Sequence, residues 1–280
     1  MAPALLVFAV FFYFALGFNI YLSLSSWNLL SPERHFVGLA NYRAVLTSPR
    51  FHRTLWNTIL YTAGSTAASM ATGLALALGL RRVTRFARLL QGALFAPYII
   101  SWVSVALLWL WLLDPQYGLV DAALTRLGLP AVNWLGAESI ALWSLVLLTV
   151  WKAVGYDMVT YLAGLQAIPS TVYEAAALDG AGAGAQLFRI TLPLLGPTIF
   201  FLLVTSVIFS FEAFDIVNIM TQGGPIHDAT YLFVYFIYVV GFQYFQIGQA
   251  AAASILLFLI LFVLTVLEFR FLQRRVHYAS

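Results

Sequence analysis

Six apolar runs, each long enough to cross a lipid bilayer as a helix, divide this chain of 280 residues. A helix needs about 20 mostly apolar residues to cross a hydrocarbon layer roughly 30 Å thick. The runs that meet this length are 3–24, 57–80, 89–113, 139–162, 194–216 and 248–272. Only 9% of the residues are charged, against about 25% in a soluble domain. We therefore expect an all-α integral membrane protein, with six transmembrane helices in a single domain over residues 1–280.

The orientation follows from the basic residues near the ends of the runs, because cytoplasmic loops are enriched in lysine and arginine. Arginines fill the short loop 81–88 and follow the last run. Placing both sets inside predicts that both termini are cytoplasmic. The first run is expected to be retained as a span, since no basic segment precedes it and no A-x-A cleavage site follows it.

The loop at about 164–193, between the fourth and fifth runs, is predicted to be ordered. Pro169 ends the preceding helix, since proline disfavours helix in the residue before it. Thr171 and Glu174 are spaced as a capping box, which predicts that a short helix begins there. Gly180 permits the turn that ends this helix. On the orientation above, the loop is cytoplasmic.

This loop offers an alanine face together with the carboxylates of Glu174 and Asp179. Such a surface suits the docking of another protein. The alternative is a helix lying in the lipid headgroup layer, but such helices are usually rich in lysine and arginine. Arg189 is the one basic residue of the loop.

The loop resembles the cytoplasmic signature of the permease subunits of binding-protein-dependent ABC importers. That signature is E-A-A, three residues, G, nine residues and I-x-L-P, and its fixed positions are occupied here by Glu174, Ala175, Ala176, Gly180, Ile190, Leu192 and Pro193. In that family the loop enters a cleft of a cytoplasmic ATPase subunit. The resemblance implies that coupling to ATP hydrolysis is carried by Glu174, Ala175, Ala176, Asp179 and Gly180.

Three flanking segments are similar to the maltose and glycerol-phosphate group of this family. They are FVGLANY at 36–42, LQAIP at 165–169 and TQGGP at 221–225. The resemblance implies the type I importer permease fold, a multi-pass location in a bacterial-type inner membrane, and uptake of a sugar, oligosaccharide or glycerol-phosphate-type solute.

The resemblance also implies partners. They are a second homologous permease, which makes a heterodimer, two ATP-binding cassette subunits and an extracytoplasmic solute-binding protein; nucleic acid is not expected. Lys152 is the one lysine of the chain and does not follow a glycine-rich loop, so the chain cannot be a P-loop ATPase. No catalytic residue, metal site or cofactor is predicted in this chain, and ATP and Mg²⁺ are expected on the ATPase subunits.

Two helix faces are candidates for the substrate pathway, because ionisable and polar residues inside spans are costly. The first face combines Thr149, Lys152 and Tyr156, and the second combines Ser206, Phe209, Ser210 and Ala213. In maltose-type permeases the matching faces contact the sugar. Aromatic and hydroxyl groups suit a sugar or polyol.

Lys152 has two possible roles. Its charge can attract an anionic group such as phosphate, or it can pair with Asp157 or Glu212 to satisfy helix packing. Glu212 and Asp215 are themselves expected in solvent or against the partner permease.

Two other functional classes fit the sequence less well. A secondary transporter should show inverted repeats and broken helices at the membrane midplane, and no convincing repeat is present. A membrane-embedded enzyme would need His, Asp or Glu clustered at one membrane face, and the sequence offers no such cluster.

Overall fold

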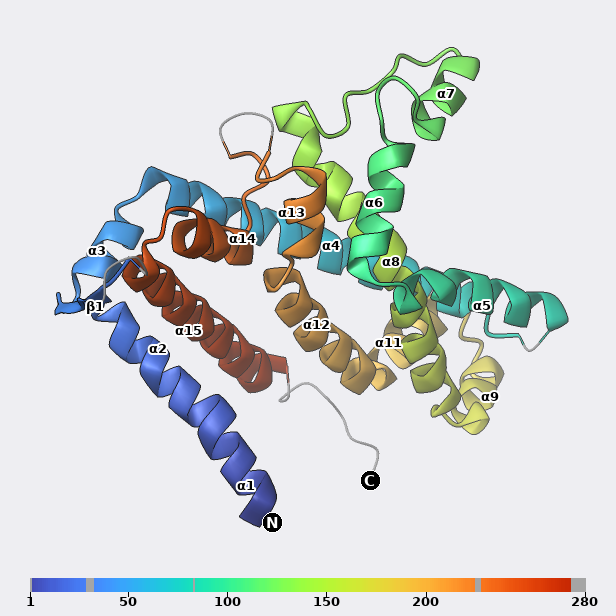
Figure 1. The fold of residues 1–280 in the computed structure, drawn as a ribbon. Helices are drawn as coiled ribbons and strands as arrows, with labels where there is room; N and C mark the ends of the chain where they lie inside the picture. The colour runs from blue at the N-terminus through green and yellow to red at the C-terminus, as the bar shows by residue number, and fades with distance from the viewer. Residues whose placement is uncertain (1, 29–32, 83, 225–227, 273–280) are drawn as a thin grey trace.

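The computed structural model describes residues 2–28, 33–82, 84–224 and 228–272, and helices dominate it (Figure 1). In chain order these are α1 (Ala2–Phe8), η1 (Ala9–Phe14), α2 (Ala15–Ser23), α3 (Ala40–Leu46), α4 (Pro49–Gly79), α5 (Arg85–Ile99), α6 (Trp102–Leu112), α7 (Leu119–Arg126), α8 (Glu138–Gln166), α9 (Ser170–Leu178), α10 (Ala183–Gln186), η2 (Leu187–Thr191), α11 (Leu192–Leu194), α12 (Gly196–Phe211), α13 (Asp215–Met220), α14 (Phe233–Tyr238), η3 (Val239–Gln243) and α15 (Ile247–Leu272). Two short strands, β1 (Ser25–Ser26) and β2 (His35–Phe36), pair antiparallel.

Helices occupy all six predicted runs, but the runs differ in kind. Among the described residues, three helices are long and apolar enough to cross a membrane: Leu5–Ser23, Glu138–Gln166 and Ile247–Arg270. Two more runs are broken helices, bent by 102° between α5 and α6 and by 65° before α12, which raises the number to at most five. The remaining run, 57–80, lies almost entirely in α4, whose 31 residues span about 46 Å at 1.5 Å per residue. The fold is the predicted all-α membrane fold, and the count of six spans stays a prediction.

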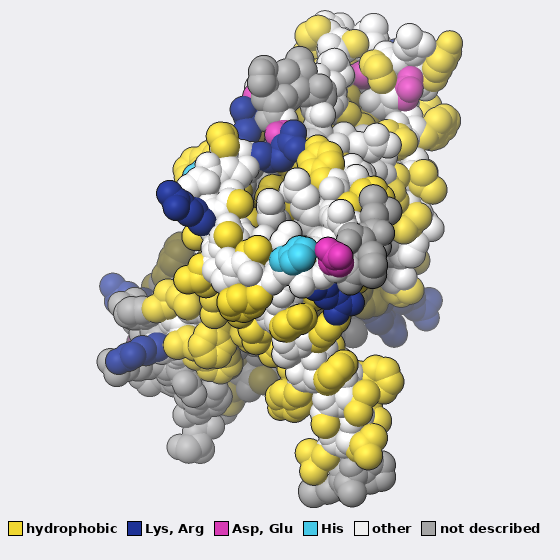
Figure 2. All heavy atoms as spheres, turned by 60° about the vertical axis from the view of Figure 1, so that its left-hand side comes forward, with side chains coloured by type: hydrophobic (Ala, Val, Ile, Leu, Met, Phe, Trp, Pro, Cys, Tyr) yellow, Lys and Arg dark blue, Asp and Glu magenta, His cyan; other side chains and the backbone are white. Residues whose placement is uncertain are grey.

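The first helical segment projects from the body of the protein, and its surface is apolar (Figure 2). Phe11 and Phe14 are 77% and 70% exposed. In water such a surface would be costly, whereas lipid tails or another apolar helix cover it without loss.

Helix α8 lies at the centre and packs against α4, α5 and α12. Three glycines allow this close approach. A Cβ at Gly73 of α4 would lie 2.7 Å from the Cβ of Asp157, and one at Gly164 would meet Thr198 of α12. A Cβ at Gly155 would meet the backbone of α5. Small residues at helix contacts are typical of membrane proteins, because helix association in lipid depends on close packing.

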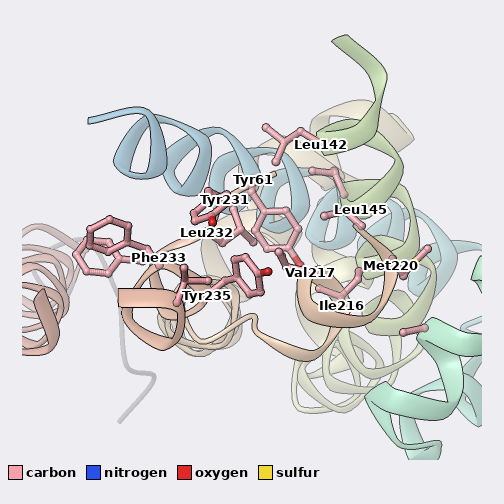
Figure 3. Close-up of a cluster of buried hydrophobic side chains, with 14 of the residues drawn as sticks. Tyr61, Leu142, Leu145, Ile216, Val217, Met220, Tyr231, Leu232, Phe233 and Tyr235 are labelled. Atoms are coloured by element: carbon pink, nitrogen blue, oxygen red, sulfur yellow. The ribbon is translucent and has the colours of Figure 1, made fainter. Parts of the chain in front are cut away.

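A buried cluster joins α4, α8, α13 and α14 (Figure 3). Tyr61, Leu145, Leu232 and Phe233 are fully buried in it. The segment from α13 to α14 contains Gly223 and Gly224, whose φ angles of +94° and +114° are readily adopted only by glycine.

Arg50, in the first turn of α4, ties this segment to the rest of the fold. Its Nε lies 2.7 Å from Oδ2 of Asp228, and its Nη1 donates to the Tyr244 hydroxyl at 2.9 Å. The hydrogen bond to the Asp228 carboxylate raises the pKa of Arg50. Asn57 of α4 also donates to the Asp228 carbonyl oxygen, at 3.0 Å.

We expect Arg50→Met to lower the unfolding free energy by about 1 kcal/mol, a value limited by the partial exposure of the ion pair. The measurement is thermal unfolding in detergent at low and high salt. The difference between wild type and variant should shrink in high salt, since the pair is screened. Arg43→Met, at an exposed arginine of α3, is the matched control and should leave the melting temperature unchanged. An equal loss in both variants would contradict the assigned tether.

Candidate functional site

A cavity of about 540 Å³ opens between α4, α8, α12 and the break that separates α5 from α6. All seven residues predicted for the substrate pathway line it: Thr149, Lys152, Tyr156, Ser206, Phe209, Ser210 and Ala213. The structure thus brings the two predicted helix faces together around one space. Contact of these residues with a solute stays a prediction.

Helix α4 supplies a third wall, which the sequence analysis missed. This wall consists of hydroxyl side chains, those of Tyr61, Ser65, Thr66 and Ser69. The Tyr61 hydroxyl lies 2.6 Å from Oγ1 of Thr149, and the Ser65 hydroxyl lies 3.2 Å from that of Ser210. The signal was present in the sequence, because hydroxyl residues recur every three or four positions from Thr54 onward, which places them on one helix face.

The α5–α6 break forms the fourth wall, with Tyr98, Ile100, Ser101 and Trp102. The Tyr98 ring stacks on that of Tyr156, with centroids 4.6 Å apart and planes inclined by 15°. Helix α6 begins after Ser101, whose hydroxyl accepts from the Ser104 backbone N–H at 3.2 Å. An aromatic pair thus lies beside hydroxyl groups, a combination that suits a ring-shaped polyol.

Lys152 is 3% exposed and bonds to the end of α5. Its Nζ donates to three backbone carbonyl oxygens, those of Pro97 (3.0 Å), Tyr98 (3.1 Å) and Ile100. The predicted alternative of an ion pair with Asp157 or Glu212 is therefore wrong. The Lys152 ammonium satisfies backbone carbonyls that a helix end leaves free, which is a common role of lysine at a helix C-terminus.

Three carboxylates also border the cavity, those of Asp157, Glu212 and Asp215. Asp157 is 1% exposed, and its Oδ2 has no hydrogen-bond partner among the described residues. Glu212 is exposed and Asp215 is half-buried. The exposure of Glu212 agrees with its expected place in solvent, and both carboxylates also line the cavity. Contact with a partner permease stays a prediction.

The predicted loop forms a short helix, α9, but its start differs from the prediction. Pro169 is the N-cap, and no side chain caps the helix. The expected capping box of Thr171 and Glu174 is wrong, because the helix begins at Ser170 and Thr171 already lies inside its first turn. Proline can begin a helix without a side-chain cap, since it lacks one of the N–H groups that a helix start leaves unbonded.

The end of α9 confirms the predicted role of Gly180. Its φ angle is +76°, in the left-handed region. The Gly180 N–H donates to the Ala177 carbonyl oxygen at 3.1 Å, and the Ala181 N–H donates to that of Ala176 at 2.9 Å. These two bonds define a Schellman motif with Gly180 at its left-handed position.

The predicted coupling residues share one exposed tip. Glu174, Ala175, Asp179 and Gly180 are exposed, and Ala176 is half-buried. Leu178, on the same helix, is 90% exposed. Figure 1 shows α9 at the lower right, away from α7 at the top of the view. The tip thus presents Leu178 and exposed alanines beside two carboxylates, and its use as a protein-binding surface stays a prediction.

The tip is fastened to the following helix. The Tyr173 hydroxyl lies 3.1 Å from Oγ1 of Thr191, a buried residue of the I-x-L-P segment. The Gln186 side chain donates to the Ala181 carbonyl oxygen at 3.0 Å. The first bond joins α9 to η2, and the second joins the turn after α9 to α10, so a displacement of α9 is expected to be passed on to α12.

The chain matches known proteins over both the cavity and the loop. The family model of binding-protein-dependent transport system inner membrane components covers residues 69–278. The sn-glycerol-3-phosphate transport system permease protein UgpA of Yersinia pestis bv. Antiqua (strain Antiqua) is 35% identical over 279 residues, 99% of this chain and 93% of that protein. A probable ABC transporter permease protein of Pyrococcus horikoshii is 36% identical over 228 residues, 80% of this chain and 78% of that protein.

Two solved structures share the fold. A bacterial alginate ABC transporter in complex with an alginate pentasaccharide-bound periplasmic protein has a TM-score of 0.86 and 25% identity, over 100% of this chain and 94% of that chain. A bacterial ABC transporter involved in the import of the acidic polysaccharide alginate has a TM-score of 0.84 and 26% identity, over 97% of this chain and 93% of that chain.

Proposed function

This chain belongs to the family of binding-protein-dependent transport system inner membrane components, and from this premise we propose that it imports a sugar, an oligosaccharide or a glycerol-phosphate-type solute. It is a permease, a transporter component rather than an enzyme. A binding protein delivers the solute from outside. The energy comes from two separate ATPase subunits that bind ATP and Mg²⁺, and a second homologous permease completes the pathway as a heterodimer.

The observation that carries this proposal is the continuity of the cavity helices with the exposed loop. Helix α8 lines the cavity and ends at Gln166, four residues before α9 begins. Helix α12, which lines the opposite wall, follows the loop through α10, η2 and α11. A force on α9 therefore acts on both walls. We propose that ATP-driven closure of the ATPase pair moves α9 in this way and opens the cavity alternately to the two sides, with both termini and α9 in the cytoplasm.

The cavity chemistry supports a hydroxylated solute. Its hydroxyl side chains can donate to and accept from a sugar, and the stacked pair of Tyr98 and Tyr156 offers an aromatic face. The relatives named above handle sn-glycerol 3-phosphate and alginate, both polyhydroxylated. The proposed substrate pathway is lined by Thr149, Lys152, Tyr156, Ser206, Phe209, Ser210 and Ala213.

Reconstitution tests this function. The chain is co-expressed with a second permease, the ATPase subunits and a binding protein of its family, and the complex is placed in liposomes. We expect ATP hydrolysis only from the complete assembly, with stimulation by the binding protein and maltose, glycerol 3-phosphate or alginate oligosaccharides. Uptake that continues without ATP and stops when the ion gradient is collapsed would instead indicate a secondary transporter.

A further inference from the structure

We propose that Lys152 is a positioning residue that clamps the break between α5 and α6 and so holds the aromatic wall of the cavity in place. The proposal deepens the proposed function, on which it rests for the meaning of the cavity. It assigns Lys152 to the backbone of its own chain rather than to an anionic solute.

The break creates a need for hydrogen-bond donors. The last carbonyl groups of a helix have no partner within the helix and carry partial negative charge. Inside a membrane protein, a non-helical backbone is tolerated only where it is buried in protein or lines a cavity. At the end of α5 the chain turns by 102°, and the carbonyl groups of Pro97, Tyr98 and Ile100 lie at this turn, where they need donors from another part of the chain.

The Lys152 ammonium supplies donors to these three carbonyl groups. A lysine ammonium has three N–H donors, and each has one of the three carbonyl oxygens within hydrogen-bond distance. The Nζ also lies 4.9 Å from the ring centroid of Trp102, the first residue of α6, in a cation–π contact. One side chain of α8 therefore binds both sides of the break.

Local packing brings α8 close enough for this clamp. Gly155, three residues after Lys152 and thus on the same helix face, lies against the α5 backbone at Leu94 and Phe95. The clamp in turn fixes the backbone of Tyr98, whose ring stacks on Tyr156 of α8.

The clamp has a consequence for which solutes the cavity can bind. With its donors used, Lys152 does not serve as the phosphate-binding group that a lone lysine in a pathway suggests. Among the described residues that line this cavity, the other acidic or basic side chains with a charge at neutral pH are the carboxylates of Asp157, Glu212 and Asp215. Beside its hydroxyl groups, the described lining of this cavity therefore presents carboxylates to a solute, while its one lysine is bound to backbone. An anionic cargo would have to be recognised by another part of the assembly.

Distance measurements between spin labels test the clamp, and the absence of cysteine from the chain makes them direct. The assembled importer, with its other subunits made free of cysteine, carries labels at Leu89→Cys on α5 and Leu107→Cys on α6, both exposed sites. A reference pair at Ile59→Cys on α4 and Leu147→Cys on α8 reports the remaining fold. We expect Lys152→Met to widen the α5–α6 distance distribution at least about twofold and to leave the reference pair unchanged. Lys152→Arg, which keeps the donors, should restore the narrow distribution.

An unchanged α5–α6 distribution in Lys152→Met would overturn the clamp, and so would an equal widening in Lys152→Arg. A second measurement on the wild-type complex covers the case in which Lys152→Met does not fold. Because Lys152 is the one lysine of the chain, its acetylation by a water-soluble succinimidyl ester is read from a single peptide. We expect labelling at least about 100-fold slower than in the detergent-unfolded chain, and rapid labelling would overturn the proposal. Neither readout depends on transport, so ATP-driven uptake tests the proposed function separately.

Discussion

Gly180→Val is expected to abolish ATP-driven uptake while the membrane part of the chain stays folded. Gly180 has a φ angle of +76°, and a residue with a Cβ there costs about 1–2 kcal/mol, more when it is β-branched. The valine therefore favours loss of the two bonds that end α9, and the exposed tip with Glu174 changes shape. A cost of about 2 kcal/mol on the docked loop corresponds to roughly 30-fold weaker binding of the ATPase.

The measurement compares solute uptake and ATP hydrolysis in proteoliposomes with the melting temperature of the purified complex. Gly184→Ala is the matched control, since Gly184 lies in the same loop without a positive φ and an added Cβ would meet no atom within 4 Å. It should keep full uptake. Normal coupling in Gly180→Val would show that the α9 tip does not engage the ATPase in the proposed way.

Gly155→Ala is expected to destabilise the fold strongly, because the closest approach of α8 to α5 is made by backbone atoms. The added Cβ would lie 2.6 Å from the carbonyl carbon of Leu94 and 2.7 Å from the Cα of Phe95. A flexible side chain could move aside, but two helix backbones cannot. Overpacking usually costs 1–3 kcal/mol, and we expect about 3 kcal/mol here. The melting temperature should fall by roughly 10 °C.

Gly92→Ala, in α5, is the control for this prediction. An added Cβ at Gly92 meets no atom within 4 Å, and alanine is favoured over glycine in a helix by about 0.5–1 kcal/mol. Its melting temperature in detergent should therefore stay the same or rise. A similar melting temperature for both variants would mean that α5 does not approach α8 this closely.

The sequence predicted correctly those structural features that depend only on residues close together in the chain. Apolar length located the helices, because each helix must satisfy its own backbone within lipid. The left-handed turn at Gly180 followed from residue type, since glycine adopts that conformation at little cost. The helical spacing of Thr149, Lys152 and Tyr156 placed them on one face, and the structure confirms that this face lines the cavity.

The errors arose where a residue's partner depends on the rest of the fold. The capping box failed because the position of a helix start depends on its neighbours, and α9 begins at Ser170. The partners of Lys152 could not be foreseen, because every residue has a backbone carbonyl group and only the break identifies the free ones. The wall formed by α4 could not be found from apolar length, because the residues of α4 that face the cavity carry buried hydroxyl groups.

The amino-acid sequence by itself determined that this chain is a helical membrane protein with an ordered loop that carries a coupling signature. Both properties are set within short segments, by apolar length and by residue type at fixed spacing. Only the tertiary structure decided that four walls enclose one cavity and that Lys152 binds the end of α5. These features depend on residues about 50 to 150 positions apart in the chain. Such residues come into contact only when α8 packs between α4, α5 and α12.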